Sequence, residues 1–465
     1  MISSAILILI VAKALPGLNT QFSSIHVTRI STLVFLFAGA LSFNTLECIG
    51  SGIGLYSGFF QVTTISQAIE IFLFTIGGGI LIANNDKHYS LVVLLSSLGS
   101  SLLISSYDLI SLYLSIELQS FGLYILSTLF RDSESSTAAG LKYFLLGGLS
   151  SCIILLGTGI IYSYSGSTNL DVLYSLLSIQ GLDLGFVLIY IGFLFKIAAA
   201  PLHNWSPDVY DGTPTIVTTW LTIIPKISIL FILLELQVKL GNIMLVATQN
   251  SSILNNNIFK YLLLISATLS VIIGSLLGLA QVKIKRLLAY STISHIGFIL
   301  LALAVNTEQS IDSFIFYIIQ YTITNFNIFL VILALSPDLM FIHEFKGLYF
   351  RNPLLSFSIA ISLFSMAGIP PLIGFFSKQL VLYSALQNGY YFIPIVAIIV
   401  SVISCSYYLL IIKLIFQRKL TNNNDLILSN THSYLISTLT FSILFFFIKP
   451  SLFLNSTKLL ALSVF

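Results

Sequence analysis

The amino-acid sequence predicts an all-α polytopic membrane protein, because of its composition, its long uncharged runs and the short links between them. Of its 465 residues, 57% are hydrophobic and only 8% are charged, with a mean hydropathy of +1.00. A soluble domain carries roughly a quarter of its residues as Asp, Glu, Lys or Arg, so this chain has too few charges to cover a surface that faces water. Apolar runs extend from end to end, and we expect one membrane domain over residues 1–465 rather than several soluble domains.

Apolar runs of transmembrane length recur along the whole sequence. A helix needs about 20 largely apolar residues to cross the hydrocarbon core, and division of the sequence at polar or charged residues yields about 14 such segments. In order, the segments are 1–18, 28–47, 66–83, 89–107, 108–130, 138–163, 184–210, 213–239, 257–280, 284–305, 310–336, 353–387, 390–416 and 433–463. The links between them are short and polar, which favours a helical bundle. A β-barrel would instead show alternating segments about ten residues long.

The first segment, residues 1–18, predicts a transmembrane helix rather than a leader that is removed. It holds a single charge, Lys13, and lacks a small-residue cleavage pattern. It also lacks the arginine-rich composition of a transit peptide.

Two features of the sequence argue against nucleic-acid binding and metal binding. The densest basic clusters, residues 283–286 and 418–419, flank apolar runs, where such clusters more often set the orientation in the membrane. The cysteines lie far apart and form no CxxC, so disulfides, zinc sites and iron–sulfur ligation have no support. We expect Cys48, Cys152 and Cys405 to be buried thiols.

Two predicted spans contain helix-breaking residues in their middles, so we expect broken helices near residues 196–205 and 366–378. The first break follows Lys196 and contains Pro201, and the second contains Pro370 and Pro371 between two glycines. Broken helices at matching places in two halves are typical of transporters built from inverted repeats. The alternative is a pair of ordinary proline kinks. A run of small residues before each Pro-Leu, with a lysine near each break, favours the repeats.

Four ionisable residues stand out inside the predicted spans, where a charge costs on the order of 2.5–3.5 kcal/mol. Glu117 is the only charge in residues 109–130, Lys196 directly precedes the first break, and Lys226 follows Pro225. Lys378 stands alone in residues 352–412. Burial favours the neutral form of both lysine and glutamate, so a buried Glu–Lys pair can be charged together or neutral with its proton passed on. These four residues are therefore candidates for a proton relay, with mobile water bridging the gaps.

Three further residues are weaker candidates for the same relay. His295 lies in the middle of its span, but a membrane histidine is as often a satisfied structural residue as a proton carrier. Lys142 and Lys285 lie near the starts of their spans and could instead be interfacial anchors. We expect Glu235, Lys239 and Lys413, near span ends, to be solvated.

The sequence carries no signature of a redox or nucleotide cofactor. A b-type cytochrome needs paired histidines on facing spans, and only His295 is clearly central. No phosphate-binding or dinucleotide glycine motif stands between a strand and a helix. We expect a chain that moves ions, contacts lipid and protein, or does both.

Five stretches of the sequence resemble the antiporter-like subunits of respiratory NADH:quinone oxidoreductase, known as complex I. The most specific is residues 195–214, Phe-Lys-Ile-Ala-Ala-Ala-Pro-Leu-His-Asn-Trp-Ser-Pro-Asp-Val-Tyr-Asp-Gly-Thr-Pro. The others are residues 115–126, 139–148, 281–295 and 366–378, and their order and spacing agree with the family. Within the family, Gln119 and the stretch from His203 to Tyr210 are similar to the chain 2 subunits.

The resemblance implies a fold of about 14 helices with two inverted five-helix repeats, in which the seventh and twelfth helices are broken. It implies N-terminal helices in residues 1–107, a first half-channel repeat in 108–239, a second in 257–416 and a C-terminal helix in 417–465. It also implies a main proton path through Glu117, Lys196, Lys226 and Lys378. Lys142, Lys285 and His295 match the family's secondary polar axis.

The function implied by the resemblance is proton translocation in the membrane arm of complex I, driven by electron transfer from NADH to ubiquinone. NADH, FMN, iron–sulfur clusters and ubiquinone would be bound by other subunits. Neighbouring antiporter-like subunits and lipid would be the partners, without nucleic acid. The location would be the mitochondrial inner membrane, or the inner membrane of a bacterium.

Parts of the chain depart from the family pattern, and two other functions stay open. Lys283 replaces a residue that is usually polar or acidic, and little matches in the first hundred residues or after Lys419. The first alternative is a subunit of a secondary cation/proton antiporter. The second is a structural, lipid-binding scaffold whose charges only pair.

Overall fold

The computed structural model describes residues 1–15, 24–46, 52–83, 89–130, 132–176, 181–247, 258–335, 340–417 and 429–464. These residues are mostly helical, and within them the only strands are β1 (Ile53–Leu55) and β2 (Phe60–Val62), which pair antiparallel. The chain forms two compact units. Unit 1 comprises residues 1–197, 220–258 and 464, and unit 2 comprises residues 198–219 and 259–463.

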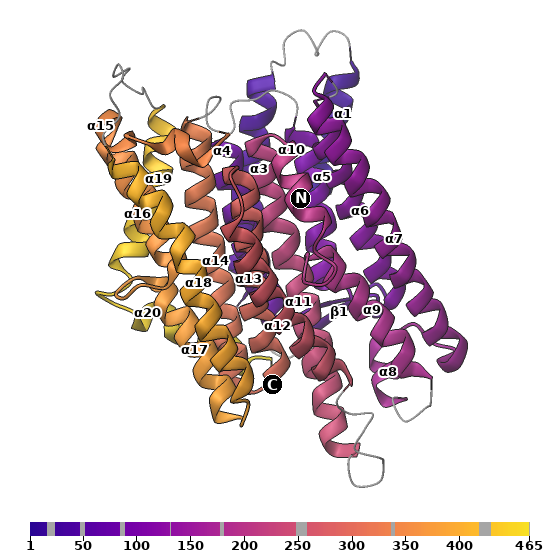
Figure 1. Ribbon diagram of the computed structural model, residues 1–465. Helices are drawn as coiled ribbons and strands as arrows, with labels where there is room; N and C mark the ends of the chain where they lie inside the picture. Colours follow the sequence, from indigo (N-terminus) through magenta and orange to yellow (C-terminus); the bar gives the residue numbers. More distant parts are fainter. Residues whose placement is uncertain are drawn as a thin grey trace. The chain divides into compact units, whose positions relative to one another are not determined.

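Unit 1 is built from helices that pack in sequential pairs. Its helices are α1 (Ile2–Ala14), α3 (Ser24–Thr45), α4 (Thr64–Ile82), α5 (Ser90–Ser105), α6 (Leu109–Thr128), α7 (Glu134–Ser165), α8 (Leu170–Ser175), α9 (Leu182–Lys196) and most of α11 (Thr215–Ala247). The pairs α3–α4, α5–α6 and α7–α9 make the most extensive contacts, and Figure 1 shows α7 and α9 side by side. Glycines permit this closeness, since a Cβ on Gly157 would lie 2.7 Å from the Gly185 carbonyl oxygen.

Unit 2 is organised around α14, which contacts five other helices. Its helices are α10 (Trp205–Gly212), α12 (Ile258–Leu279), α13 (Ile284–Val305), α14 (Glu308–Leu335), α15 (Leu348–Arg351), α16 (Pro353–Ala367), α17 (Ile373–Gln387), α18 (Phe392–Phe416), α19 (Asn430–Phe445), α20 (Ser451–Leu462) and the 3₁₀ helix η3 (Ile342–Phe345). Helix α14 packs against α13, α16, α17, α19 and α20. Most of its side chains are therefore buried, polar ones included.

Nine of the described helices are long and apolar enough to cross a membrane, and three more apolar helices are shorter. Their outer faces carry large apolar side chains, as on α7, where Leu141, Phe144, Leu145 and Leu149 are exposed. Exposed leucine and phenylalanine in such numbers suit a lipid solvent rather than water.

Helices occupy the expected segments within the described residues, nine of them long and apolar enough to cross a membrane, and the helical structure is interrupted at both expected breaks. The first break separates α9 from α10, and the second separates α16 from α17. The described part of the last expected segment, residues 433–463, differs, because it forms two helices that divide near Pro450. Proline has no N–H for the helical ladder, so α20 begins after it. The hairpin of β1 and β2 was not expected from the sequence.

Some expected positions need correction, and others lie outside the described residues. Cys152 is exposed on α7 rather than buried, because it shares the outward apolar face of that helix, and Cys405 is half-buried. Lys142 also lies on the exposed side of α7. Cys48 and the basic pair at residues 418–419 are not among the described residues.

Candidate functional site

The first group of expected site residues lies in unit 1 and centres on an ion pair. Lys196 Nζ lies 3.8 Å from Glu117 Oε1, and the two side chains are 7% and 15% exposed. Glu117 comes from the middle of α6, while Lys196 is the last residue of α9, just before the first break. The C-terminal end of a helix carries partial negative charge, so both the carboxylate and the end of α9 stabilise the ammonium group.

Helix α6 is held in place by a close approach to α5 and by a hydrogen bond to α11. A Cβ on Gly99 of α5 would lie 2.5 Å from the backbone nitrogen of Gln119, so only glycine fits there. The Gln119 amide nitrogen donates to Ser228 Oγ at 3.0 Å. Gln119 is two residues from Glu117, and Ser228 is two residues from Lys226. This bond therefore links the backbones that carry both candidates.

Lys226 lies inside α11 and is 2% exposed. It follows Pro225, which has no N–H and leaves a carbonyl of the preceding turn without its usual helical partner. The structure thus places Glu117, Lys196 and Lys226 in the interior of the protein. Lys142, in contrast, is exposed on the outer surface of α7.

A second carboxylate near the far end of α11 was misjudged from the sequence. Glu235 is half-buried rather than solvated and interacts electrostatically with Lys239 and Asp171. Tyr107 donates to Asp171 Oδ1 at 2.6 Å in the same cluster. Tyr174 is 3% exposed there, and its hydroxyl has no hydrogen-bond partner among the described residues. The spacing of Glu235 and Lys239, one helical turn apart in an apolar stretch, was the available signal.

The second group lies in unit 2, where Lys378 binds the end of a helix instead of a carboxylate. Lys378 is 8% exposed, and its Nζ donates to the carbonyl oxygens of Met366 at 2.8 Å and Ala367 at 3.1 Å. These are the last two residues of α16, whereas Lys378 belongs to α17. Among the described residues, no Asp or Glu forms an ion pair with Lys378. The lysine therefore satisfies the unpaired carbonyls at the end of α16.

His295 is buried in unit 2 between tyrosines from two other helices. It is 3% exposed. Its Nδ1 lies 2.8 Å from the Tyr317 hydroxyl of α14, and its Nε2 lies 3.4 Å from the Tyr408 hydroxyl of α18. Imidazole and phenol groups can each donate and accept a hydrogen bond, so this trio can pass a proton as well as hold the helices together.

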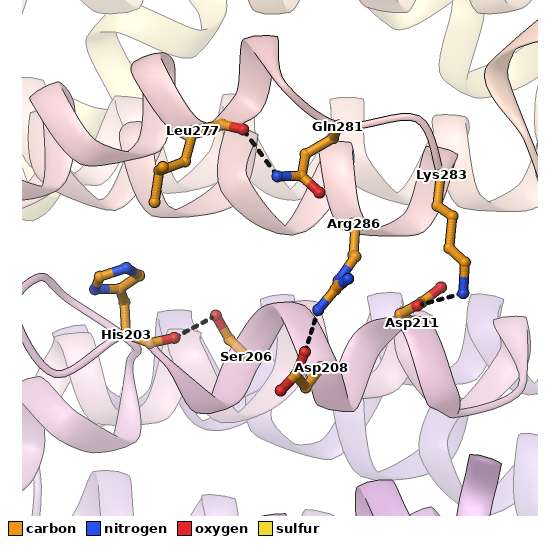
Figure 2. A network of polar contacts seen from close by, with 8 residues as sticks. All are labelled: His203, Ser206, Asp208, Asp211, Leu277, Gln281, Lys283 and Arg286. Carbon is orange, nitrogen blue, oxygen red and sulfur yellow. Dashed lines mark hydrogen bonds and ion pairs between the residues drawn. The ribbon is translucent and has the colours of Figure 1, made fainter.

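Lys285 belongs to a polar network that binds α10 to the start of α13. Its Nζ donates to the Thr213 carbonyl oxygen at 2.8 Å. Figure 2 shows the flanking ion pairs, in which Arg286 binds Asp208 and Lys283 binds Asp211, the latter pair at 2.9 Å. Lys285 thus lies among charges that neutralise one another, which agrees with an anchoring role as well as with a place on a proton path.

The two groups share a chemistry that suits proton transfer. A lysine can release and regain a proton, and in each group a carboxylate, a helix end or hydroxyls lie close enough to stabilise its charged form. Within the described ranges, no three His, Cys, Asp or Glu residues gather to bind a metal.

Residues 106–404 match the family model described as NADH:quinone oxidoreductase/Mrp antiporter, transmembrane region. The chain is 44% identical to the NADH-ubiquinone oxidoreductase chain 2 of Rhizopus oryzae, with all of both chains covered. It is 35% identical to the NADH-quinone oxidoreductase subunit N of Pelagibacter ubique, over 94% of this chain and 93% of that one.

A solved structure of similar fold also comes from respiratory complex I. A chain of respiratory complex I from Thermus thermophilus with bound aureothin superimposes with a TM-score of 0.82 and 28% identity. The match covers 98% of this chain and 99% of that chain. The similarity therefore extends over nearly the whole chain.

Proposed function

Since this chain belongs to the NADH:quinone oxidoreductase/Mrp antiporter family of membrane proteins, we propose that it translocates protons in a respiratory NADH:ubiquinone oxidoreductase. It does so through buried Glu and Lys residues, coupled to electron transfer from NADH to ubiquinone. The observation that carries the proposal is the Glu117–Lys196 pair, because two ionisable groups are held 3.8 Å apart in membrane helices beside a helix break.

In this proposal, Lys196 loads and releases a proton under the control of Glu117. The 3.8 Å separation exceeds hydrogen-bond length, so a proton crosses it after the side chains approach or through a water molecule. While Glu117 is charged it favours the ammonium form of Lys196, and neutralisation of Glu117 removes that stabilisation. Lys226, two residues from Ser228 in the same unit, takes the next position on the path.

Unit 2 supplies a second set of proton-carrying groups. Lys378 holds a proton against the carbonyl oxygens of Met366 and Ala367, and His295 exchanges protons with its tyrosine partners. Lys285 and the exposed Lys142 are assigned to the ends of the path. The path thus consists of Glu117, Lys142, Lys196, Lys226, Lys285, His295 and Lys378.

We further propose a fold of about 14 transmembrane helices with two inverted five-helix repeats, one in residues 108–239 and one in 257–416. Each repeat then contains one broken helix and its lysine, which supports the assignment. The proposed partners are the other membrane-arm subunits, especially antiporter-like chains, together with lipid and water. Those other subunits would bind NADH, FMN, iron–sulfur clusters and ubiquinone. The proposed location is the mitochondrial inner membrane, or the inner membrane in a bacterium.

The test is to replace each break lysine by methionine, which has similar length and no charge. Complex that carries Lys196→Met or Lys378→Met is purified, reconstituted into liposomes and supplied with NADH and ubiquinone. We expect assembled complex with a strongly reduced proton gradient per NADH oxidised. Lys413→Met is the matched control, because Lys413 is exposed on α18 and lies outside the proposed path. Unchanged proton movement in both break variants would contradict the proposal and favour a scaffold role.

The family also includes Mrp antiporters, so cation/proton exchange is the second candidate function. A native gel of mildly solubilised membranes, stained for NADH oxidation, separates the two. A very large NADH-oxidising band that contains this chain supports the first function. A smaller, inactive complex of hydrophobic chains supports exchange, which sodium/proton assays would then measure.

A further inference from the structure

Two asparagines on α14 are fully buried and lack hydrogen-bond partners. Asn325 and Asn327 are each 0% exposed. The amide nitrogen and the amide oxygen of both side chains make no hydrogen bond to any of the described residues. Buried polar side chains are nearly always hydrogen-bonded in folded proteins, and the low dielectric of a membrane protein makes an unpaired amide still less favourable. Four such atoms within one turn of helix therefore need a partner.

Asn325 continues a row of polar side chains on α14 that begins at Tyr317, the partner of His295 on α13. On a helix, residues four apart lie on the same side, so Tyr317, Tyr321 and Asn325 form one row along α14. Tyr317 is bonded to His295 Nδ1, and the ring of Tyr321 lies 6.2 Å from the His295 ring. The unpaired amide of Asn325 is the next polar group of this row.

Asn327 continues a second row, which begins at Ser377 of α17. Gln320, Thr324 and Asn327 are spaced by four and three residues, which again places them on one side of α14. Gln320 contacts Thr324 Oγ1 at 3.5 Å and Ser377 Oγ at 3.5 Å. Ser377 directly precedes Lys378. Because Asn325 and Asn327 are only two residues apart, their side chains point to different sides of the helix, although the two rows are neighbours where Tyr321 and Thr324 lie three residues apart.

We propose that Asn325 and Asn327 each bind water, and that these waters extend the two polar rows of α14 as part of the proton path in unit 2. The proposal rests on the proposed function. Water fits the unpaired atoms better than a metal cation does, because each amide leaves both a donor and an acceptor unpaired. A cation binds only the oxygens, whereas water accepts from the nitrogen of one amide and donates to the oxygen.

Water bound in this way can carry a proton without any change in the asparagines. One O–H bond forms on the water as a neighbouring group gives up its proton, and another O–H bond of the same water breaks toward the next acceptor. The amides do not titrate, so they are positioning residues that hold the water in line with Tyr321 or Thr324. Lys378 and His295 remain the groups that store the proton.

The first experiment is a cryo-EM reconstruction of the assembled complex at a resolution that shows ordered water. We expect density at about 2.7–3.2 Å from an amide atom of both Asn325 and Asn327. The absence of density at both would overturn the proposal. Density that disappears when sodium is removed from the buffer would also overturn it, because a cation would then be the ligand.

The second experiment replaces each asparagine by leucine, which has similar volume and no polar atom. We expect Asn325→Leu and Asn327→Leu to lose the water density and to slow proton translocation by roughly tenfold, since leucine cannot replace the hydrogen bonds of the displaced group. Thermal stability should change little, because leucine removes the amide together with the water that is bound to it. Thr322→Val is the control, since Thr322 is equally buried on α14 but donates to the Ile319 carbonyl oxygen.

Two outcomes separate this proposal from the proposed function. Normal translocation in both leucine variants would overturn the role of these waters, even with the density present in the unaltered complex. Normal translocation in both Lys196→Met and Lys378→Met would instead overturn the proposed function, and the water density would be unaffected by that result.

Discussion

Lys196 and Lys378 each lie beside a break in a membrane helix, but the groups around their ammonium nitrogens differ. Lys196 faces the carboxylate of Glu117 and ends its own helix, α9. Lys378 faces the carbonyl oxygens at the end of another helix, α16. The first lysine therefore meets a full opposite charge that can itself be neutralised, whereas the second meets backbone dipoles that cannot change. In the proposed path, loss of the proton is therefore tied to a titrating partner at the first break and to helix geometry at the second.

The largest effect on stability is expected for Lys196→Met. This change leaves Glu117 without its partner in the interior, and breaking a buried pair from one side costs about 3 kcal/mol of unfolding free energy or more. Thermal unfolding of the purified complex measures the loss. Glu117→Gln combined with Lys196→Met should recover most of the stability but not proton translocation. A double variant as unstable as the single one would show that the pair is not coupled.

Lys378→Met should destabilise the protein by about 2 kcal/mol, because two carbonyl groups at the end of α16 lose their donor. The same thermal measurement applies. Replacement of an Asp or Glu elsewhere should not rescue this variant, because Lys378 has no carboxylate partner among the described residues. Lys378→Arg, which retains N–H donors, should keep much of the stability. A loss equal to that of Lys196→Met would remove the distinction between the two breaks.

Glu117→Gln should cost about 1 kcal/mol, because glutamine keeps an oxygen near Lys196 and the end of α9 still stabilises the cation. Proton translocation should be slower but measurable in reconstituted complex. Lys196 is still present in this variant, and Glu117 only adjusts the stability of its charged form. An unchanged ratio of protons moved to NADH oxidised, in fully assembled complex, would count against the pairing.

Gly368→Ala tests the geometry of the second break. Gly368 has φ +86°, and a Cβ there would lie 3.1 Å from Lys378 Cδ. The matched control is Gly389→Ala, since Gly389 has φ +81° with open space around it. Both changes should cost about 1 kcal/mol for the backbone alone, but only Gly368→Ala should also slow translocation. Equal translocation in the two variants would show that the position of Lys378 is not critical.

The smallest effect is expected for Lys283→Gln in the network of Figure 2. The Lys283–Asp211 pair is partly exposed, so its loss should cost about 0.5 kcal/mol and matter less at high salt. Thermal unfolding at two salt concentrations measures this. A loss as large as that of Lys378→Met would mean that the network, rather than the breaks, holds unit 2 together.

Much of the fold could be predicted because membrane helices are recognisable in a sequence by their length and composition. Uncharged runs bounded by polar residues located most helices, and the prolines at 201, 370 and 371 located both breaks. Short-range effects were missed. The division of the last segment near Pro450 and the hairpin at residues 53–62 depend on a few local residues inside otherwise apolar sequence.

The charges of the candidate site and a buried Glu–Lys pair were predictable from the sequence, but the partners of Lys378 were not. Isolated charges in apolar runs pointed to Glu117, Lys196, Lys226 and Lys378, and all four are largely buried. That Lys378 binds backbone carbonyls follows only from the positions of α16 and α17, which no local pattern encodes. Asparagines such as Asn325 carry no charge, so hydropathy did not separate them from the many satisfied polar residues in the same helices.

The bond from Lys378 to α16 makes the stiffness of the second break depend on a single proton. An ammonium group offers three charged N–H donors, whereas the neutral amine offers two donors that form weaker hydrogen bonds to the same carbonyl oxygens. Backbone amide exchange at Gly368 and Ile369, which bond to the last turn of α16, should therefore be slower in Lys378→Arg, where the charge is permanent, than in Lys378→Met. We therefore expect α16 and α17 to be held together more firmly when Lys378 is charged than when it is neutral.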